Sequence, residues 1–241
     1  MKNFKLIALI AGVILISSFT SCIFNFSGIK GNGTIKKEVR TVRDFSEIEV
    51  SGMYKVYLTQ GKTNSLSIEG DENLMQYVIT KNEGDKLVIE TKKSLNPTGD
   101  LKVYLSFISL ESIDLSGACE VIGENRLKFD QIEFEGSGAS EFTLDMKADK
   151  VEFDLSGASE IHLTGKANKV NIDGSGAIKI SAFNFIINDC KVDLSGASEA
   201  DLNVTNNLSI DVSGAATITY KGGAKIIKQS TSGASSIRVA D

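Results

Sequence analysis

Residues 151–161 read VEFDLSGASEI, and related segments centred on Ser-Gly-Ala occur seven times in the C-terminal half of the chain. A period of about 20 residues is typical of repeat proteins, in which each repeat buries its apolar side only by stacking on its neighbours. The sequence therefore predicts regular repeats from about residue 111 to residue 239. The triplets begin at Ser116, Ser137, Ser156, Ser175, Ser195, Ser213 and Ser232, with successive spacings of 21, 19, 19, 20, 18 and 19 residues.

Polarity alternates on both sides of each triplet, which indicates strands rather than helices. In the quoted segment, Val151, Phe153 and Leu155 share one face, whereas Glu152 and Asp154 share the other. Each repeat is therefore predicted to be strand, turn, strand, with one solvated face. The equivalent positions predicted to point inward are Ile113, Leu115, Val121, Ile132, Phe134, Phe142, Ile161, Val170, Ile172, Ile180, Val192, Leu194, Leu208, Ile210, Val212 and Ile218.

The residues at the turns agree with this design. Gly accepts backbone angles that a side chain excludes, and Ser and Ala are small enough to stack on their equivalents in the next repeat. A second turn is indicated at residues 147–150 (KADK) and 166–169 (KANK). Short repeats with two main strands predict an all-β fold, a parallel β-helix or β-solenoid with strands about 4.8 Å apart. A meander of antiparallel hairpins is the alternative, and it would need a primed turn at each hairpin.

The N-terminus has the features of an export signal. Lys2 and Lys5 precede an apolar run, residues 6–16, which has the length of a signal peptide and is short for a membrane span. The small residues that follow end at Cys22 and resemble the lipobox of bacterial lipoproteins. Phe19 departs from that pattern, which commonly has Leu at this position. The segment therefore predicts a lipoprotein in which Cys22 is acylated.

This interpretation divides the chain into three parts. Residues 1–21 are expected to be the signal peptide, and residues 22–33 the tether between the lipid and the folded part. Residues 34–240 are expected to form a single domain with an irregular β-rich section at its start. An ordinary cleaved secretory signal and an uncleaved membrane anchor are the alternatives for the N-terminus.

Composition limits the partners that this chain is expected to bind. The 241 residues are 41% hydrophobic and carry a formal net charge of −5, so the chain can bury one substantial core and has an acidic surface. Loss of Lys2 and Lys5 with the signal would make the mature chain more acidic. Phosphate backbones are bound by clustered Lys and Arg, so nucleic acid is not expected as a partner. The expected partners are the membrane, through the lipid, and a glycan or a surface protein.

Two further cysteines, Cys119 and Cys190, are expected to be free thiols with a packing role. They lie at least three repeats apart, which exceeds the separation that a disulfide tolerates.

Acidic residues recur in step with the repeats, two positions before the serine. Carboxylates stacked at about 4.8 Å repel one another, so cations, neighbouring lysines or turn amides must relieve the row. Three interpretations stay open: turn capping or a plain solvated face, calcium binding, and a glycosidase-like pair, which would need two carboxyls in different environments. The residues are Asp114, Glu135, Asp154, Asp173, Asp193 and Asp211, with Glu120, Glu141, Glu160 and Glu199 repeated after the turn.

Catalysis is not expected from the residue types present. His162 is the one histidine of the chain, and it lies at an outward strand position. No separate Ser-His-Asp or Cys-His set can be assembled, and no Cys and His spacing fits a metal site. The glycines follow the repeat period rather than opening a helix, so they do not form a phosphate-binding loop. We expect no catalytic, cofactor or metal residues.

The upstream section, residues 30–110, carries a looser version of the same design. Residues 45–58 alternate around Ser51-Gly52, and further strands are predicted at residues 65–69, 86–91 and 100–105. A short helix is predicted at residues 71–79, with Asp71 as its cap.

Several motifs in this order resemble the head GIN domain family of auto-transporter adhesins over about residues 35–235. They are Gly31-Asn32-Gly33, Val39-Arg40, Phe45, Val50-Ser51-Gly52 and Gln60-Gly61, followed by the Ser-Gly-Ala turns. The resemblance implies a right-handed β-helix akin to the pectin-lyase superfamily, in an exported protein of Bacteroidetes type. It also implies a role in adhesion and no established catalytic site.

Three functions are therefore compared. The expected one is a non-catalytic, lipid-anchored protein of the cell envelope, in the outer membrane, that binds a glycan or a protein. A polysaccharide-active β-helical enzyme is the second, since this fold hosts such enzymes. The third is a structural protein that assembles through its open ends. Gln229 and Ser230 replace apolar and acidic residues in the last repeat, and this polar end argues against continued stacking.

Overall fold

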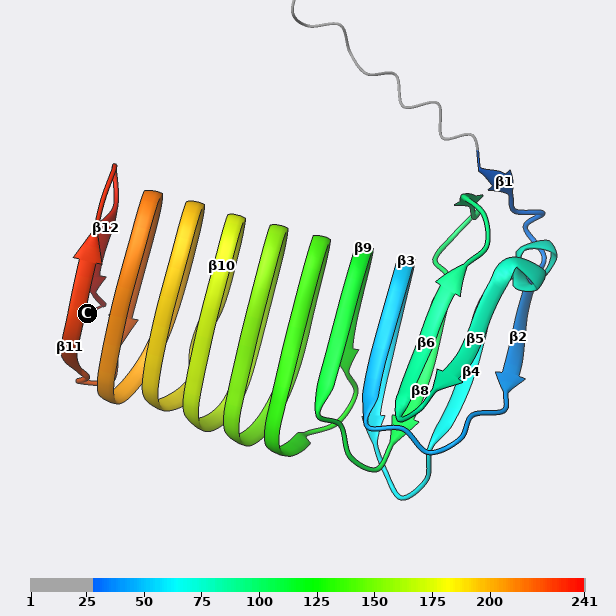
Figure 1. Cartoon of the computed structure of the whole chain (residues 1–241), viewed down its shortest axis with the longest axis horizontal. Helices are drawn as coiled ribbons and strands as arrows, with labels where there is room; N and C mark the ends of the chain where they lie inside the picture. Colours follow the sequence, from blue (N-terminus) through cyan, green and yellow to red (C-terminus); the bar gives the residue numbers. More distant parts are fainter. Residues whose placement is uncertain (1–27, 241) are drawn as a thin grey trace, which may run out of the picture.

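A computed structural model describes residues 28–240, which are all-β apart from one short 3-10 helix, η1 (Glu72–Tyr77). The strands are β1 (Ile29–Lys30), β2 (Ile35–Arg40), β3 (Glu47–Gln60), β4 (Ser65–Asp71), β5 (Val78–Glu83), β6 (Lys86–Thr91), β7 (Leu95–Asn96), β8 (Lys102–Phe107), β9 (Ser112–Gly123), β10 (Leu127–Lys221), β11 (Lys225–Thr231) and β12 (Ser236–Val239). A mixed sheet of ten strands has the main order β11-β10-β9-β3-β8-β4-β2, and β1 and β7 form a separate pair (Figure 1).

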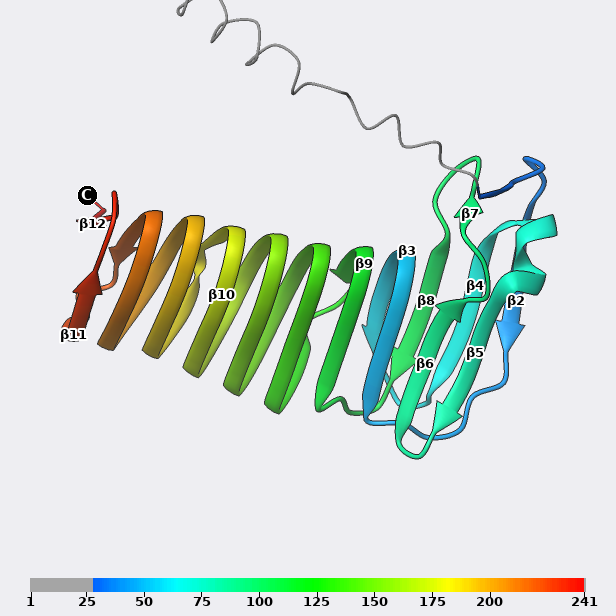
Figure 2. The same ribbon diagram turned by 45° about the horizontal axis from the view of Figure 1, so that its top comes forward.

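The repeats pair in parallel and in register. Ser51 of β3, Ser116 of β9 and Ser137 of β10 lie in one row across the sheet. Farther along β10, the glycine of each Ser-Gly-Ala triplet lies against the backbone of the triplet before it. Figures 1 and 2 show β10 as successive turns that lie side by side between β9 and β11. The antiparallel alternative is therefore wrong for the repeats.

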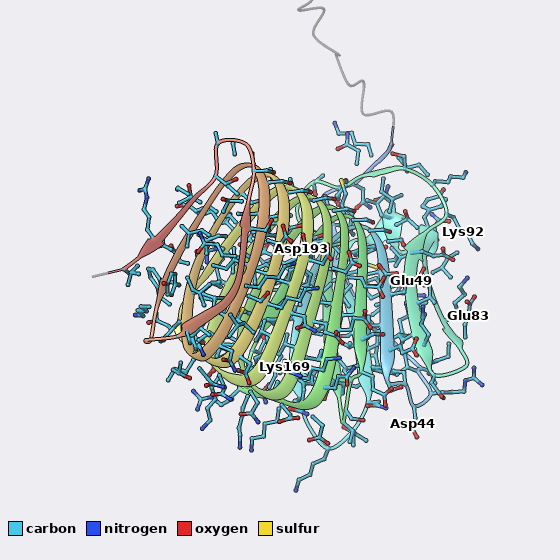
Figure 3. The ribbon with its side chains drawn as sticks, turned by 60° about the vertical axis from the view of Figure 1, so that its left-hand side comes forward. Asp44, Glu49, Glu83, Lys92, Lys169 and Asp193 are labelled. Atoms are coloured by element: carbon cyan, nitrogen blue, oxygen red, sulfur yellow. The ribbon has the colours of Figure 1, made fainter. Side chains whose placement is uncertain are left out.

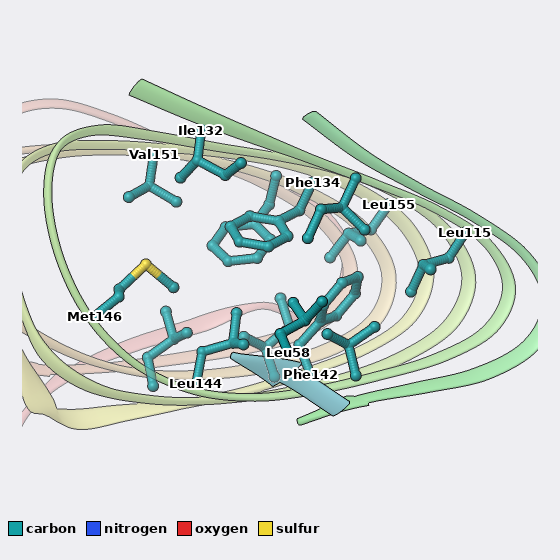
Figure 4. Packing of buried hydrophobic residues seen from close by; sticks show 14 of the residues in the cluster. Leu58, Leu115, Ile132, Phe134, Phe142, Leu144, Met146, Val151 and Leu155 are labelled. Atoms are coloured by element: carbon teal, nitrogen blue, oxygen red, sulfur yellow. The ribbon is translucent and has the colours of Figure 1, made fainter. Parts of the chain in front are cut away.

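The core lies inside these turns. Every apolar residue that the alternation predicts to point inward is buried, which confirms the strand prediction. Side chains from the two walls meet in the interior, as Figure 4 shows for Phe134 and Phe142. The ring centroids of these two residues lie 5.5 Å apart in an edge arrangement. Phe153, from the next repeat, stacks on Phe134 at 4.9 Å. The aromatic rings thus join neighbouring repeats as well as opposite walls.

The N-terminal section departs from the parallel design. β2 pairs with β4, β4 with β8, and β5 with β6, all antiparallel. Two residues, Gly84 and Asp85, join β5 to β6, and Gly84 has φ +63°. So short a connection requires an antiparallel pair, because a parallel neighbour needs a long crossover. An all-parallel sheet is therefore wrong for this section.

Strand structure also begins before the expected domain boundary at residue 34. β1 pairs with β7 through Ile29 and Leu95, within the segment expected to be a tether. The predicted signal peptide and Cys22 lie outside the described residues.

The C-terminal end is polar, as the sequence predicts. A β-bulge at Ile227 shifts the register of β11, so that Gln229 faces Ile210, and Ser230 faces Asp211 of β10. A polar side chain therefore occupies the position that earlier repeats fill with an apolar one.

The helix predicted at residues 71–79, with Asp71 as its cap, is not present in that form. The helix is the shorter 3-10 turn η1, and the Asp71 side chain makes no cap hydrogen bond to it. The buried carboxylate instead accepts hydrogen bonds from the Gly33 amide at 2.6 Å and from the Thr98 amide at 2.9 Å. The Thr98 hydroxyl also donates to Asp71, at 2.8 Å. Asp71 thus ties the start of the chain to the loop after β7.

Asp71→Asn is expected to lower the free energy of unfolding by about 1–2 kcal/mol at neutral pH, because a charged acceptor of two backbone amides is lost. Burial raises the pKa of Asp71, but the hydrogen bonds from Thr98 and Gly33 outweigh it, and the pKa lies below its ordinary value. The stabilisation is therefore full above the unfolded pKa, near 4, and is lost as the pH falls through the folded pKa. Urea unfolding of both proteins, measured at neutral pH and near pH 2, should show the difference shrinking in acid. A difference independent of pH would contradict this role.

Candidate functional site

A groove of about 640 Å³ runs along the Ser-Gly-Ala turns of four successive repeats, in β9 and β10. We call it the Ser-Gly-Ala groove. Its floor is formed by exposed alanines, Ala118, Ala139, Ala158 and Ala177. One wall is formed by the loop at Pro97 to Leu101, which follows β7. The floor is shallow because the triplets supply only methyl groups and backbone, which lets an extended ligand approach closely.

Charged residues form the rim of the groove. Lys55 Nζ lies 2.8 Å from Glu120 Oε2, and Lys179 Nζ lies 2.7 Å from Glu160 Oε1. Glu141 lies between these two pairs and has no ion-pair partner among residues 28–240. The rim thus offers both carboxylates and ammonium groups to a polar ligand.

A column of buried side chains lies beneath the alanines. It contains Cys119, Ser140 and Ser159, one from each of three successive repeats. Burial raises the pKa of the Cys119 thiol to about 11, and its Sγ lies 3.7 Å from the Gly52 carbonyl oxygen. A thiol with so high a pKa is not a nucleophile at neutral pH.

Cys190 is buried as well, and burial raises its pKa to about 12. Both Cys119 and Cys190 are free, which confirms the prediction of separate thiols.

The acidic row predicted before the serines is present in register. Glu49 of β3, Asp114 of β9 and Glu135 of β10 are direct neighbours. Burial, followed by the charge of Glu49, raises the pKa of Asp114, and burial with the charge of Asp114 raises the pKa of Glu135. Both acids are therefore held in a repulsive environment.

Lysines reduce the repulsion between carboxylates at the two ends of the acidic row. Lys86 Nζ lies 3.5 Å from Glu49 Oε2, and Lys228 Nζ lies 3.0 Å from Asp211 Oδ2. The hydrogen bond from Lys228 lowers the pKa of Asp211. Figure 3 shows Asp193, an inner member of the row, on the flank of the repeats. Of the three ways of relieving the repulsion, neighbouring lysines are the one seen at both ends.

The acidic residues and His162 were the candidates for a metal site or for acid–base chemistry. Within residues 28–240, no three side chains of His, Cys, Asp or Glu converge on a point that a metal ion would occupy. His162 is half-exposed, and its Nε2 lies 3.2 Å from Glu160 Oε1, which is also bound by Lys179. The single histidine is therefore part of a surface ion-pair cluster on the outer face.

The groove itself was not predicted from the sequence. Its floor repeats with the triplets, but its wall is the loop that contains Pro97, and Lys55 and Lys179 are far apart in the chain. The small residues of the Ser-Gly-Ala triplets were the only feature of the sequence that indicated a groove.

The profile of the family described as "Putative auto-transporter adhesin, head GIN domain" matches residues 44–224. The chain belongs to this family. Membership of this head GIN family indicates a cell-envelope or surface protein with an adhesin-like domain. None of the curated proteins compared with the chain matches it.

Solved structures share the fold of this head GIN domain. A "putative adhesin" from Bacteroides fragilis has a TM-score of 0.81 at 22% identity, covering 88% of this chain and 100% of its own. A "putative lipid binding protein" from Parabacteroides distasonis has a TM-score of 0.70 at 24% identity, covering 88% and 99%. A "putative adhesin" from Parabacteroides merdae has a TM-score of 0.65 at 22% identity, covering 89% and 99%. Neither the family nor these neighbours are described as enzymes.

For the part of the chain that the structure describes, no helix combines the length and the apolar character that crossing a bilayer requires.

Proposed function

We propose that this head GIN protein is a non-catalytic, lipid-anchored component of the cell envelope that binds a glycan or a surface protein through the Ser-Gly-Ala groove. The observation that carries the proposal is the groove itself, a shallow channel across four neighbouring repeats with a small-residue floor and a charged rim. Such a channel suits an extended ligand, since it offers length and hydrogen-bonding groups rather than an enclosed cavity.

The fold that presents this groove is, in our proposal, a right-handed β-solenoid with one turn of the chain per repeat. The parallel register of β3, β9 and β10 supports it, and so does the contact of each triplet glycine with the triplet before it. A solenoid gives identical turns to neighbouring strands, which is the reason that the floor of the groove repeats.

The N-terminal sequence and the family support the location that we propose. Residues 1–21 would be removed as a signal peptide, Cys22 would carry the lipid, and the domain would face the periplasm or the cell surface from the outer membrane. β1 pairs with β7, and Pro97 in the wall of the groove follows β7 directly. The groove would therefore lie near the anchored end, where glycans and proteins of the envelope are within reach.

Ala158→Arg is expected to weaken ligand binding by the groove strongly, because the long side chain would fill its floor. The measurement is binding of the full chain in detergent to a glycan array and to whole bacterial and host cells, with a loss of at least about tenfold in affinity. Ala234→Arg is the control, since Ala234 is the exposed alanine of the last triplet and does not line the groove.

Blank arrays and blank cells with folded parent protein would contradict the proposed function. Equal binding by parent and Ala158→Arg would remove the groove from it.

A further inference from the structure

A second charged surface lies at the opposite edge of the repeats, where the chain makes its second turn. Three exposed lysines there, Lys128, Lys147 and Lys166, follow one another at intervals of 19 residues. We call them the lysine column. The connection from β9 to β10, just before Lys128, runs along this edge, whereas β1 lies at the other edge (Figure 1). Figure 3 places Lys169, close to the column in sequence, at the same turn.

Contacts on either side of the column fix its register. Gly165 lies against the carbonyl of Met146, one residue before the lysine in each strand. Two residues after each lysine, Asn168 Nδ2 donates a hydrogen bond to Asp149 Oδ1. Lys147 and Lys166 are therefore direct neighbours in the stack, separated by the spacing of adjacent strands, about 4.8 Å.

The lysine column has no direct ion-pair partner among the described residues. Within residues 28–240, none of the three lysines lies within ion-pair distance of a carboxylate, whereas eight other lysines do. The whole chain is acidic, with a net charge of −5. The row of three lysines is therefore a local concentration of positive charge on an acidic protein. Like charges at this spacing repel one another, and a bound anion would relieve the repulsion.

A cavity of about 870 Å³ lies beside the column and includes Lys128 and Lys147 in its lining. Gln131 and Asn168 add amide groups, and Phe129 adds an apolar surface. The cavity therefore combines cationic, hydrogen-bonding and apolar groups, the mixture that binds a sugar ring bearing a carboxylate.

The acids of the cavity restrict the choice of anion. Glu111, Asp130 and Asp149 line it together with the lysines. They would repel a densely charged polymer such as a nucleic acid or a highly sulfated chain. They would accept hydrogen bonds from hydroxyl groups. The ligand that satisfies both groups has many hydroxyls and about one negative charge per unit.

The period of the column favours a polymer over a single sugar. Neighbouring lysines are spaced at about 4.8 Å, close to the length of one pyranose unit in an extended chain. A linear chain with repeated carboxylates can therefore contact more than one ammonium group of the row, which a single sugar cannot do. The column also lies away from β1, so with the anchor proposed above it would point away from the membrane that holds the lipid.

We infer that the lysine column is a second binding site, which takes a linear acidic polysaccharide with one carboxylate per sugar unit. The choice of a polysaccharide over an anionic lipid surface rests on the proposed lipid anchor, and the site itself rests on the column and its cavity.

The test is calorimetric titration of the full chain in detergent with an oligogalacturonate, compared with a neutral gluco-oligosaccharide of equal length. The parent is expected to bind the oligogalacturonate, more weakly as sodium chloride is raised, and to ignore the neutral chain. The variant Lys147→Gln with Lys166→Gln is expected to bind about tenfold more weakly. Lys30→Gln with Lys92→Gln, which removes the same charge from two exposed lysines of the N-terminal section, is expected to bind as the parent does.

Absence of oligogalacturonate binding by the parent, or an equal loss in both double variants, would overturn the inference. So would equal binding of the neutral chain, or of vesicles containing phosphatidylglycerol with the same dependence on Lys147 and Lys166. Ala158→Arg separates the two proposals. It is expected to leave oligogalacturonate binding intact, so failure of the groove and failure of the lysine column give different results.

Discussion

Gly157→Ala is expected to lower the free energy of unfolding by about 3–5 kcal/mol. Gly157 has φ +98°, a conformation that side chains rarely adopt. A β-carbon there would also overlap the carbonyl oxygen of Gly138 in the preceding repeat. Backbone cannot move aside without breaking the parallel pairing of that strand, so strain and overlap add together. Thermal and urea unfolding of parent and variant measure the loss.

Gly84→Ala is the matched control. Gly84 also has a positive φ, +63°, but nothing lies within 4 Å of the position that its β-carbon would take. Backbone strain alone should cost about 1 kcal/mol there. Equal losses at Gly84 and Gly157 would show that stacking between triplets adds nothing.

Phe153→Ala is expected to lower the free energy of unfolding by about 3–5 kcal/mol. The ring is 2% exposed, stacks on Phe134 at 4.9 Å and meets Phe142 edge-on at 6.1 Å. Its removal leaves a cavity at the junction between repeats, where the neighbouring strands are held by their own pairing and cannot collapse. Equilibrium unfolding in urea is the measurement.

Phe183→Ala serves as the comparison for Phe153. Phe183 is only half-buried, and Lys221 Nζ lies 4.9 Å from the centre of its ring. Loss of this contact should cost about 1 kcal/mol or less. A loss at Phe183 as large as that at Phe153 would contradict the view that the interior rings hold successive repeats together.

Much of the repeat region was predictable because its information is local and repeated. Alternation places Ile113, Phe134 and Phe153 on one face whatever the rest of the chain does, and all three are buried. The acidic row was predictable for the same reason, since one position in each period becomes one row in the sheet. The two free cysteines followed from counting repeats.

The N-terminal section was predicted less well. Asp71 stands before a short helix, as a cap would, yet its carboxylate binds the amides of Gly33 and Thr98, 38 and 27 residues away. The antiparallel pairing of β2, β4 and β8 likewise depends on which strands meet, and no repeat specifies that. Contacts between segments distant in sequence leave no periodic pattern to recognise.

The amino-acid sequence by itself determined the strands, the inward and outward faces, the two kinds of turn and the family, because each depends on residue type at a regular spacing. Only the tertiary structure decided the Ser-Gly-Ala groove and the surroundings of the lysine column. The wall at Pro97 closes one side of the groove, and the register at Gly165 brings Lys147 and Lys166 together. Both depend on how separate turns of the chain are aligned, which is set by packing across the whole stack.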